Sequence, residues 1–62
     1  MPNLNQMELQ ELRHLIGAGE TAAKQFGLFA QNCNDPQLRS FLEDEAVKAA
    51  QNSRNLMGFL QT

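Results

Sequence analysis

Two runs of apolar residues at helical spacing, separated by one short polar segment, constrain the fold of this 62-residue chain more than any other feature. In both runs the apolar positions alternate between steps of three and four residues, which places them on one face of an α-helix. The first stripe consists of Leu9, Leu12, Ile16, Gly19, Ala23, Phe26, Ala30 and Cys33, widened on one flank by Leu15, Ala22 and Phe29. The second stripe consists of Leu38, Leu42, Glu45, Ala49, Asn52, Leu56 and Phe59, with Phe41, Ser53 and Leu60 beside it. Because β-branched residues are almost absent, the sequence predicts an all-α fold without strands.

The polar segment between the two runs predicts a tight connection between helices. Asp35 can accept hydrogen bonds from the first amides of a helix, and Pro36 suits the first helical position. Asn34 can take the left-handed conformation that closes a preceding helix, and Asn3 or Asn5 can cap the first helix. The expected organisation is a single helical hairpin over 1–62, with a helix over about 5–32, a turn over 33–35 and a helix over about 36–60.

Two glycines inside the first expected helix, Gly17 and Gly19, admit two interpretations. Each interior glycine costs about 1 kcal/mol relative to alanine, so the pair could split the helix. Gly19 also lies on the apolar stripe, where the missing side chain would let a neighbouring helix come close. The pattern alone leaves both interpretations open.

The length of the chain predicts self-association. Two antiparallel helices cover each other along one line, and a chain this short buries only about 60% of its unfolded surface when it folds alone. The chain has a single cysteine, Cys33, and a single histidine, His14. These are too few for a disulfide within the chain and provide few of the ligands that a Cys/His zinc site needs. We therefore expect an antiparallel hairpin that dimerises into a four-helix bundle, with Glu45, Asn52 and Gly19 specifying the assembly.

The charge pattern and the hydropathy pattern exclude several classes of partner. The formal net charge is −2, and the five Lys and Arg residues are dispersed, so no basic patch for nucleic acid is expected. No apolar run reaches the ~20 residues of a membrane span, and the N-terminus lacks the features of a signal peptide. These patterns predict a cytoplasmic protein that binds neither nucleic acid nor membranes.

Patterns that indicate catalysis or metal binding are sparse. Glu11 and His14 have the Glu-x-x-His spacing that supplies ligands in di-iron bundles, but His14 falls far from the centre of the stripe. Glu45 occupies the middle of the second stripe, where a buried carboxylate must be paired, hydrated or bound to an ion. Cys33 ends a helix, which is the wrong dipole end for activating a thiolate. The residues thus predict neither an enzyme nor a bound cofactor.

Several short motifs lie at fixed distances from one another in the two expected helices. They are Glu11-Leu12, Glu20, Ala23-Lys24-Gln25-Phe26 leading to Ala30, the hinge Asn34-Asp35-Pro36-Gln37-Leu38-Arg39, and the closing Gln51-Asn52, Leu56-Met57 and Leu60. With these motifs, the segment from Gln10 to Leu60 resembles the small ferritin-like proteins related to the coat F-type spore coat proteins of spore-forming bacteria. The resemblance implies a ferritin-like four-helix bundle built from two copies, a location in a spore coat, and other spore coat proteins as further partners.

The sequence departs from this family where metal ligands would be expected. Related sequences often carry a histidine beside the mid-helix glutamate, where Gly19 stands here, and further histidines in the second helix. Ala49, Ala50, Asn52 and Ser53 occupy that region of the second helix. We therefore expect a non-catalytic, self-assembling helical protein. The alternative is a divergent ferritin-like metal-binding protein or oxidoreductase, with iron or manganese held between chains by Glu20, Glu45, Glu11 and His14.

Overall fold

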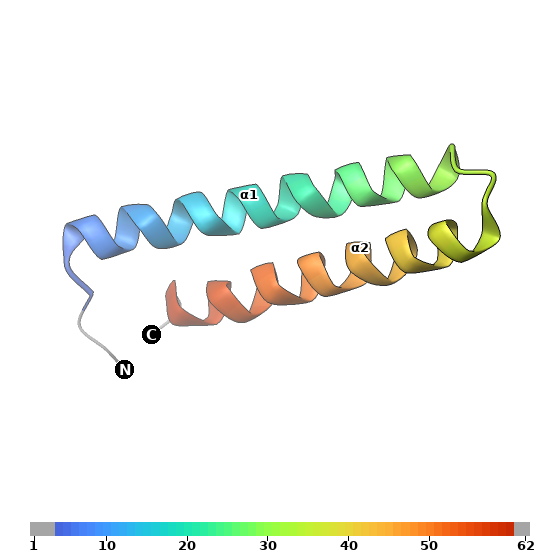
Figure 1. Cartoon of the computed structure of the whole chain (residues 1–62). Helices are drawn as coiled ribbons and strands as arrows, with labels where there is room; N and C mark the ends of the chain where they lie inside the picture. Colours follow the sequence, from blue (N-terminus) through green and yellow to red (C-terminus); the bar gives the residue numbers. More distant parts are fainter. Residues whose placement is uncertain (1–3, 61–62) are drawn as a thin grey trace.

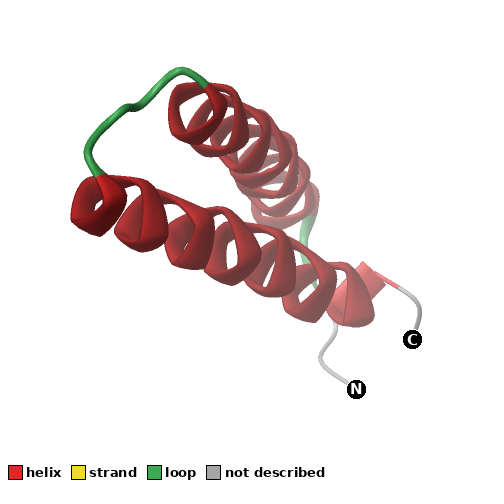
Figure 2. Ribbon diagram, turned by 90° about the vertical axis from the view of Figure 1, so that its right-hand side faces the viewer, coloured by secondary structure: helices red, strands yellow, loops and turns green. Residues whose placement is uncertain are grey.

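The computed structural model describes residues 4–60, which form two antiparallel helices joined at one end by a short connection (Figure 1). Helix α1 spans Gln6–Gln31, helix α2 spans Pro36–Met57, and the 3₁₀ turn η1 spans Gly58–Leu60. The described part of the chain contains no strand. A second view, turned by 90°, shows the two helices side by side along their lengths (Figure 2). The expected all-α hairpin is therefore confirmed.

A capping box starts α1. Asn5 Oδ1 accepts a hydrogen bond from the backbone N–H of Glu8 at 2.8 Å, and Glu8 Oε1 accepts one from the backbone N–H of Asn5 at 3.0 Å. Asn5 is thus the cap, and the other candidate, Asn3, lies outside the described residues. The helix then continues through Gly17 and Gly19 without interruption, which excludes a break at this pair.

The C-terminal end of α1 is closed differently from the expectation. Asn32 caps this end with φ −99° and ψ 5°, and its side-chain amide donates to the carbonyl oxygen of Leu28 at 2.9 Å. No non-glycine residue within 4–60 has a positive φ, so the left-handed conformation expected at Asn34 is wrong. The physical reason is that the backbone and side-chain N–H groups of Asn32 already satisfy carbonyls of the last turn.

The start of α2 follows the expected cap. Asp35 Oδ1 accepts hydrogen bonds from the backbone N–H groups of Gln37 at 2.9 Å and Leu38 at 3.1 Å. Pro36, which has no N–H to satisfy, occupies the first turn, as the sequence predicts. The two acceptor contacts offset the cost of the unpaired amides at this helix end.

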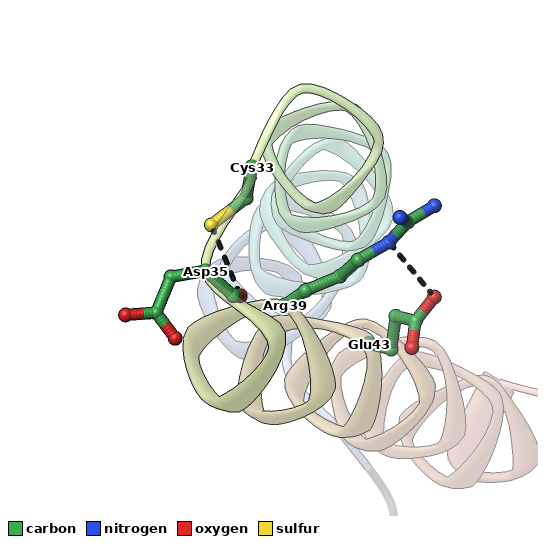
Figure 3. A network of polar contacts seen from close by, with 4 residues as sticks. All are labelled: Cys33, Asp35, Arg39 and Glu43. Carbon is green, nitrogen blue, oxygen red and sulfur yellow. Dashed lines mark hydrogen bonds and ion pairs between the residues drawn. The ribbon is translucent and has the colours of Figure 1, made fainter.

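Figure 3 shows the side chains around this connection. The thiol of Cys33, which is half-buried and free, donates a weak hydrogen bond to the carbonyl oxygen of Asp35 at 3.7 Å. One turn into α2, Arg39 Nε and Glu43 Oε2 form an ion pair at 3.9 Å. Both side chains are more than half exposed, so this pair adds little to stability.

The core between the helices is thin. Ile16, Ala30 and Leu42 are the buried apolar side chains within residues 4–60, and Ser53 is the buried polar one. The radius of gyration is 14.4 Å, whereas a compact domain of this length has about 11 Å. The hairpin is accordingly an elongated body of 46 × 16 × 12 Å with few side chains fully removed from water.

The residues of α2 that face α1 differ in part from the expected stripe. Leu42 and Ser53 are buried, but Asn52 and Phe59 are exposed. The reason is that the apolar stripe is wider than one neighbouring helix can cover. Helix α1 covers the side that carries Ser53, and the side that carries Phe41 and Phe59 stays open. The expected inward position of Asn52 is therefore wrong within the hairpin. The eight central residues of the first stripe, from Leu9 to Cys33, are buried or half-buried as expected, whereas Leu15 and Phe29 on its flank are exposed.

Replacing Asp35 with alanine tests the cap of α2. The Asp35→Ala variant loses both acceptor contacts at the start of the helix, so the free energy of unfolding should fall by about 1 kcal/mol. Asp35→Asn is the matched control, because asparagine keeps an acceptor oxygen, and it should change stability by less than about 0.5 kcal/mol. Urea unfolding followed by circular dichroism at one protein concentration measures both variants. An alanine variant as stable as the parent chain would contradict this role of the cap.

Candidate functional site

The two helices pack closely against each other at Gly19 of α1 and Ser53 of α2. Ser53 is 3% exposed, and its hydroxyl donates a hydrogen bond to the backbone carbonyl oxygen of Ile16 at 3.0 Å. A Cβ atom at position 19 would overlap Ser53 Oγ and would lie 3.7 Å from the carbonyl oxygen of Ala49. Gly19 therefore serves close packing, which is one of the two interpretations that its position in the stripe allows.

This approach sets the rotation and the register of the two helices. Since Ile16 and Gly19 lie opposite Ser53 and Ala49, residues of α1 and α2 whose numbers add up to about 70 share one level along the hairpin. Sequence reasoning missed Ser53, which it placed beside the stripe. A sequence signal for this position does exist. Ala46, Ala49 and Ser53 form a line of small residues at steps of three and four on α2, and such a line can pack closely against a helix at a position without a side chain, such as Gly19.

With the rotation set, one flank of each helix lies on the same side of the hairpin. Successive residues of a helix are about 100° apart, which places Leu15 and Phe29 on the same flank of α1. On α2, Phe41 lies on the flank that faces the same side of the hairpin. Leu15 and Phe59 line one groove, which shows directly that these two flanks meet on one side. We call this side the apolar face. Its large side chains are Leu12, Leu15, Phe26 and Phe29 of α1, Leu38, Phe41 and Leu56 of α2, and Phe59 of η1.

Most of the apolar face is open to water. Leu15 is 52% exposed, Phe29 55%, Phe41 57% and Phe59 48%. The side opposite to it, the charged face, carries exposed charged residues instead. These are Arg13, Glu20 and Lys24 of α1 and Arg39, Glu43 and Arg54 of α2. The two sides of the hairpin thus differ in their large exposed side chains, although Glu45, Lys48 and Asn52 also lie on the apolar side of α2.

The apolar face holds two shallow grooves. One groove, of about 400 Å³, lies at the open end of the hairpin, and we call it the open-end groove. It is lined by Leu4, Met7, Glu8, Glu11, Leu12, Leu15 and Phe59. The other groove, of about 260 Å³, lies toward the connection and is lined by Ala22, Gln25, Phe26 and Phe29. Both grooves offer mainly carbon surface, which suits another apolar side chain rather than a charged ligand.

The four candidate metal ligands lie in different places. Glu11 lines the open-end groove, Glu20 lines a groove on the charged face, and His14 lines a depression on the outer side of α1. Glu45, half-buried, forms an ion pair with Lys48 one turn away, at 3.9 Å from Nζ to Oε1. Within residues 4–60 no three His, Cys, Asp or Glu side chains come close enough to hold a metal ion. A site shared between chains stays a prediction.

Comparisons with known proteins do not assign the chain to a family. Neither a family model, nor a curated protein, nor a solved structure matches it. The resemblance to coat F-type spore coat proteins therefore stays a prediction. Across the part of the chain that the structure describes, neither helix is long and apolar enough to cross a membrane.

The paired glycines allow a matched test of the close approach. A methyl group at position 17 would meet nothing within 4 Å, so Gly17→Ala should raise the free energy of unfolding by up to about 1 kcal/mol through helix propensity. Gly19→Ala gains the same propensity but forces Ser53 to move, and stability should fall by about 1–3 kcal/mol. Urea unfolding at fixed protein concentration measures both variants.

A third variant assigns the loss to the contact itself. Ser53→Ala removes the hydroxyl that the new methyl group would meet, so combining it with Gly19→Ala should cost less than the sum of the two single changes. Additive losses, or a stabilised Gly19→Ala variant, would contradict the close approach.

Proposed function

We propose that this chain is a non-catalytic, self-assembling helical protein whose apolar face binds a second copy to form a four-helix bundle. The observation that carries the proposal is the amount of surface that the hairpin leaves open. Its accessible surface is 4934 Å², about 900 Å² more than the ~4,000 Å² of a folded monomer of this mass. A standard protein interface buries about 800 Å² per partner. Burying one such interface would lower the accessible surface area of the chain to about the value expected for a folded monomer of its mass.

The chemistry of the apolar face supports the same partner. Soluble monomers rarely expose contiguous apolar patches beyond a few hundred Å². Aromatic side chains are enriched at the centres of protein interfaces, and all four phenylalanines of the chain lie on this side. The charged face, in contrast, is suited to solvent. Pairing two apolar faces would surround one core with four helices and leave both charged faces outside.

The biological setting of the assembly rests on the resemblance alone. The hinge from Asn34 to Arg39 is the most distinctive part of the likeness to coat F-type proteins. On this basis the assembly would contribute to a spore coat and contact other coat proteins. The divergent metal-binding or oxidoreductase alternative gains no support within one chain, because Glu11, Glu20 and His14 line three different depressions.

Two adjacent residues of α1 provide a matched test of self-association. Phe29, on the apolar face, is 55% exposed, and Leu28, outside it, is 60% exposed. Phe29→Gln should cost about 1 kcal/mol per copy in lost burial, so the dimer dissociation constant should rise more than about tenfold. Leu28→Gln should leave the dissociation constant almost unchanged, because that side chain stays in water in both states. Light scattering and sedimentation equilibrium over a concentration series measure the constant.

The parent chain itself provides the decisive outcome. Its solution mass should approach twice the chain mass of 6.9 kDa, or a multiple of that value. A folded parent chain that stays monomeric up to about 1 mM would contradict the proposed function, since the association would then be weaker than about 4 kcal/mol.

A further inference from the structure

Few polar contacts join the two helices of one hairpin. In the described part of the chain, the hydrogen bond from the Ser53 hydroxyl to the carbonyl oxygen of Ile16, at 3.0 Å, is the one that connects α2 to α1. Both ion pairs found within residues 4–60 lie inside α2, so neither of them joins the helices. What holds α1 against α2 is therefore mainly the packing of apolar side chains along one line.

The usual stabilising devices of very short chains are missing from the described residues. Cys33 is a free thiol, and no three His, Cys, Asp or Glu side chains within 4–60 gather closely enough to hold a metal ion. Chains below ~70–80 residues commonly need such cross-links or association with another chain. The helices also gain little stability on their own, because helices in proteins depend mostly on tertiary packing.

Helix α1 is a weak helix by composition. It carries Gly17, Gly19 and Gly27 in its interior, and glycine has the lowest helix propensity of any residue except proline. The outer side of α1 near Gly17 touches nothing that would offset this cost, since a methyl group there would meet no atom within 4 Å. The stability of α1 therefore depends on the surface that the helix buries.

The surface that one hairpin buries is smaller than a folded monomer of this length requires. An unfolded chain of 6.9 kDa exposes about 10,000 Å², and the hairpin still exposes 4934 Å². Folding thus removes about half of the surface from water, whereas a folded monomer of this length removes about 60%. Burial of apolar surface is the main force that offsets the conformational entropy lost on folding.

We infer that a single copy of the hairpin does not stay folded, so that folding and self-association are one step. The inference rests on the proposed function, because a second copy supplies the missing burial. A standard interface buries about 800 Å² per partner, which raises the buried share of each chain from about half to nearly 60%. Each chain then reaches the burial that is typical of its length.

Coupling of this kind makes the concentration of the chain a switch. Each dimer forms from two unfolded copies, so the folded fraction rises with the total concentration of the chain. At low concentration the unfolded backbone is open to proteases, and at high concentration it is protected within the four helices. A cell would hold this protein either assembled or unfolded, without a pool of free hairpins.

Urea unfolding followed by two methods on the same samples tests the inference. Circular dichroism measures helical content and sedimentation equilibrium measures mass, over about a hundredfold range of protein concentration. We expect the two unfolding curves of the parent chain to coincide at every concentration, because loss of the partner and loss of helix are one event. The midpoint should rise with concentration, and in thermal unfolding each tenfold rise should raise the melting temperature by roughly 6 °C.

Each outcome of this experiment decides between the two claims. A helical species with the mass of one chain, present in urea after the dimer has dissociated, would overturn the inference and leave the proposed function intact. A parent chain that is helical and monomeric without urea up to about 1 mM would overturn the proposed function, and this inference with it. A parent chain without helix at that concentration would also overturn both.

The adjacent residues Phe29 and Leu28 provide matched variants for the same test. They are 55% and 60% exposed within one copy, so neither contributes much to the packing of a single hairpin. At the urea concentration of the parent midpoint, Phe29→Gln should raise the protein concentration needed for half-maximal helix by more than about tenfold, as it raises the dissociation constant. Leu28→Gln should leave that concentration almost unchanged.

Recovery of helix at high concentration distinguishes weakened assembly from a variant that cannot fold. Raising the concentration of Phe29→Gln should restore both its helical content and its dimer mass, because the substitution affects only the interface. Glutamine has at least the helix propensity of phenylalanine, so the loss of helix at lower concentration does not come from α1 itself. A Phe29→Gln chain that stays helical with the mass of one copy would overturn the coupling.

Discussion

The rest of this structure depends on the close approach of α1 and α2 at Gly19 and Ser53. A glycine on one helix and a buried serine on the other let the backbones come near enough for Ser53 to donate to the carbonyl oxygen of Ile16. This contact selects one rotation for each helix. Because each apolar stripe is wider than the contact, the same rotation decides which flank is covered and which is left open.

The open flank links the packing of the chain to its proposed function. A hairpin with three buried apolar side chains within residues 4–60 has little core of its own, and its exposed surface exceeds the normal value for its mass. The uncovered residues are large and aromatic and lie together, with polar residues between them. This distribution favours a partner with the same pattern, because a second copy supplies an apolar region for each end and a polar centre. In the proposed dimer, the stability of the chain and its assembly would depend on one interface.

The sequence predicts some parts of the fold better than others. The start of α2 follows from Asp35 and Pro36, since caps depend on a few neighbouring residues and not on tertiary contacts. The closure of α1 does not follow in the same way, because Asn32 and Asn34 both have side chains suited to a helix end and only Asn32 is used as the cap. For the candidate site, the breadth of the stripes is visible in the sequence, whereas the open flank is not.

What the sequence determines by itself is the helical hairpin and the presence of more apolar surface than two helices can cover. Both follow from local spacing and from counting. What only the tertiary structure decides is that Ser53 is buried, that Asn52 is exposed, and that Phe29 and Phe41 share one open face. A rotation of α2 by half of the ~100° between successive residues would exchange the roles of neighbouring positions such as 52 and 53. Helical periodicity does not resolve so small an angle, but the steric fit between Gly19 and Ser53 does.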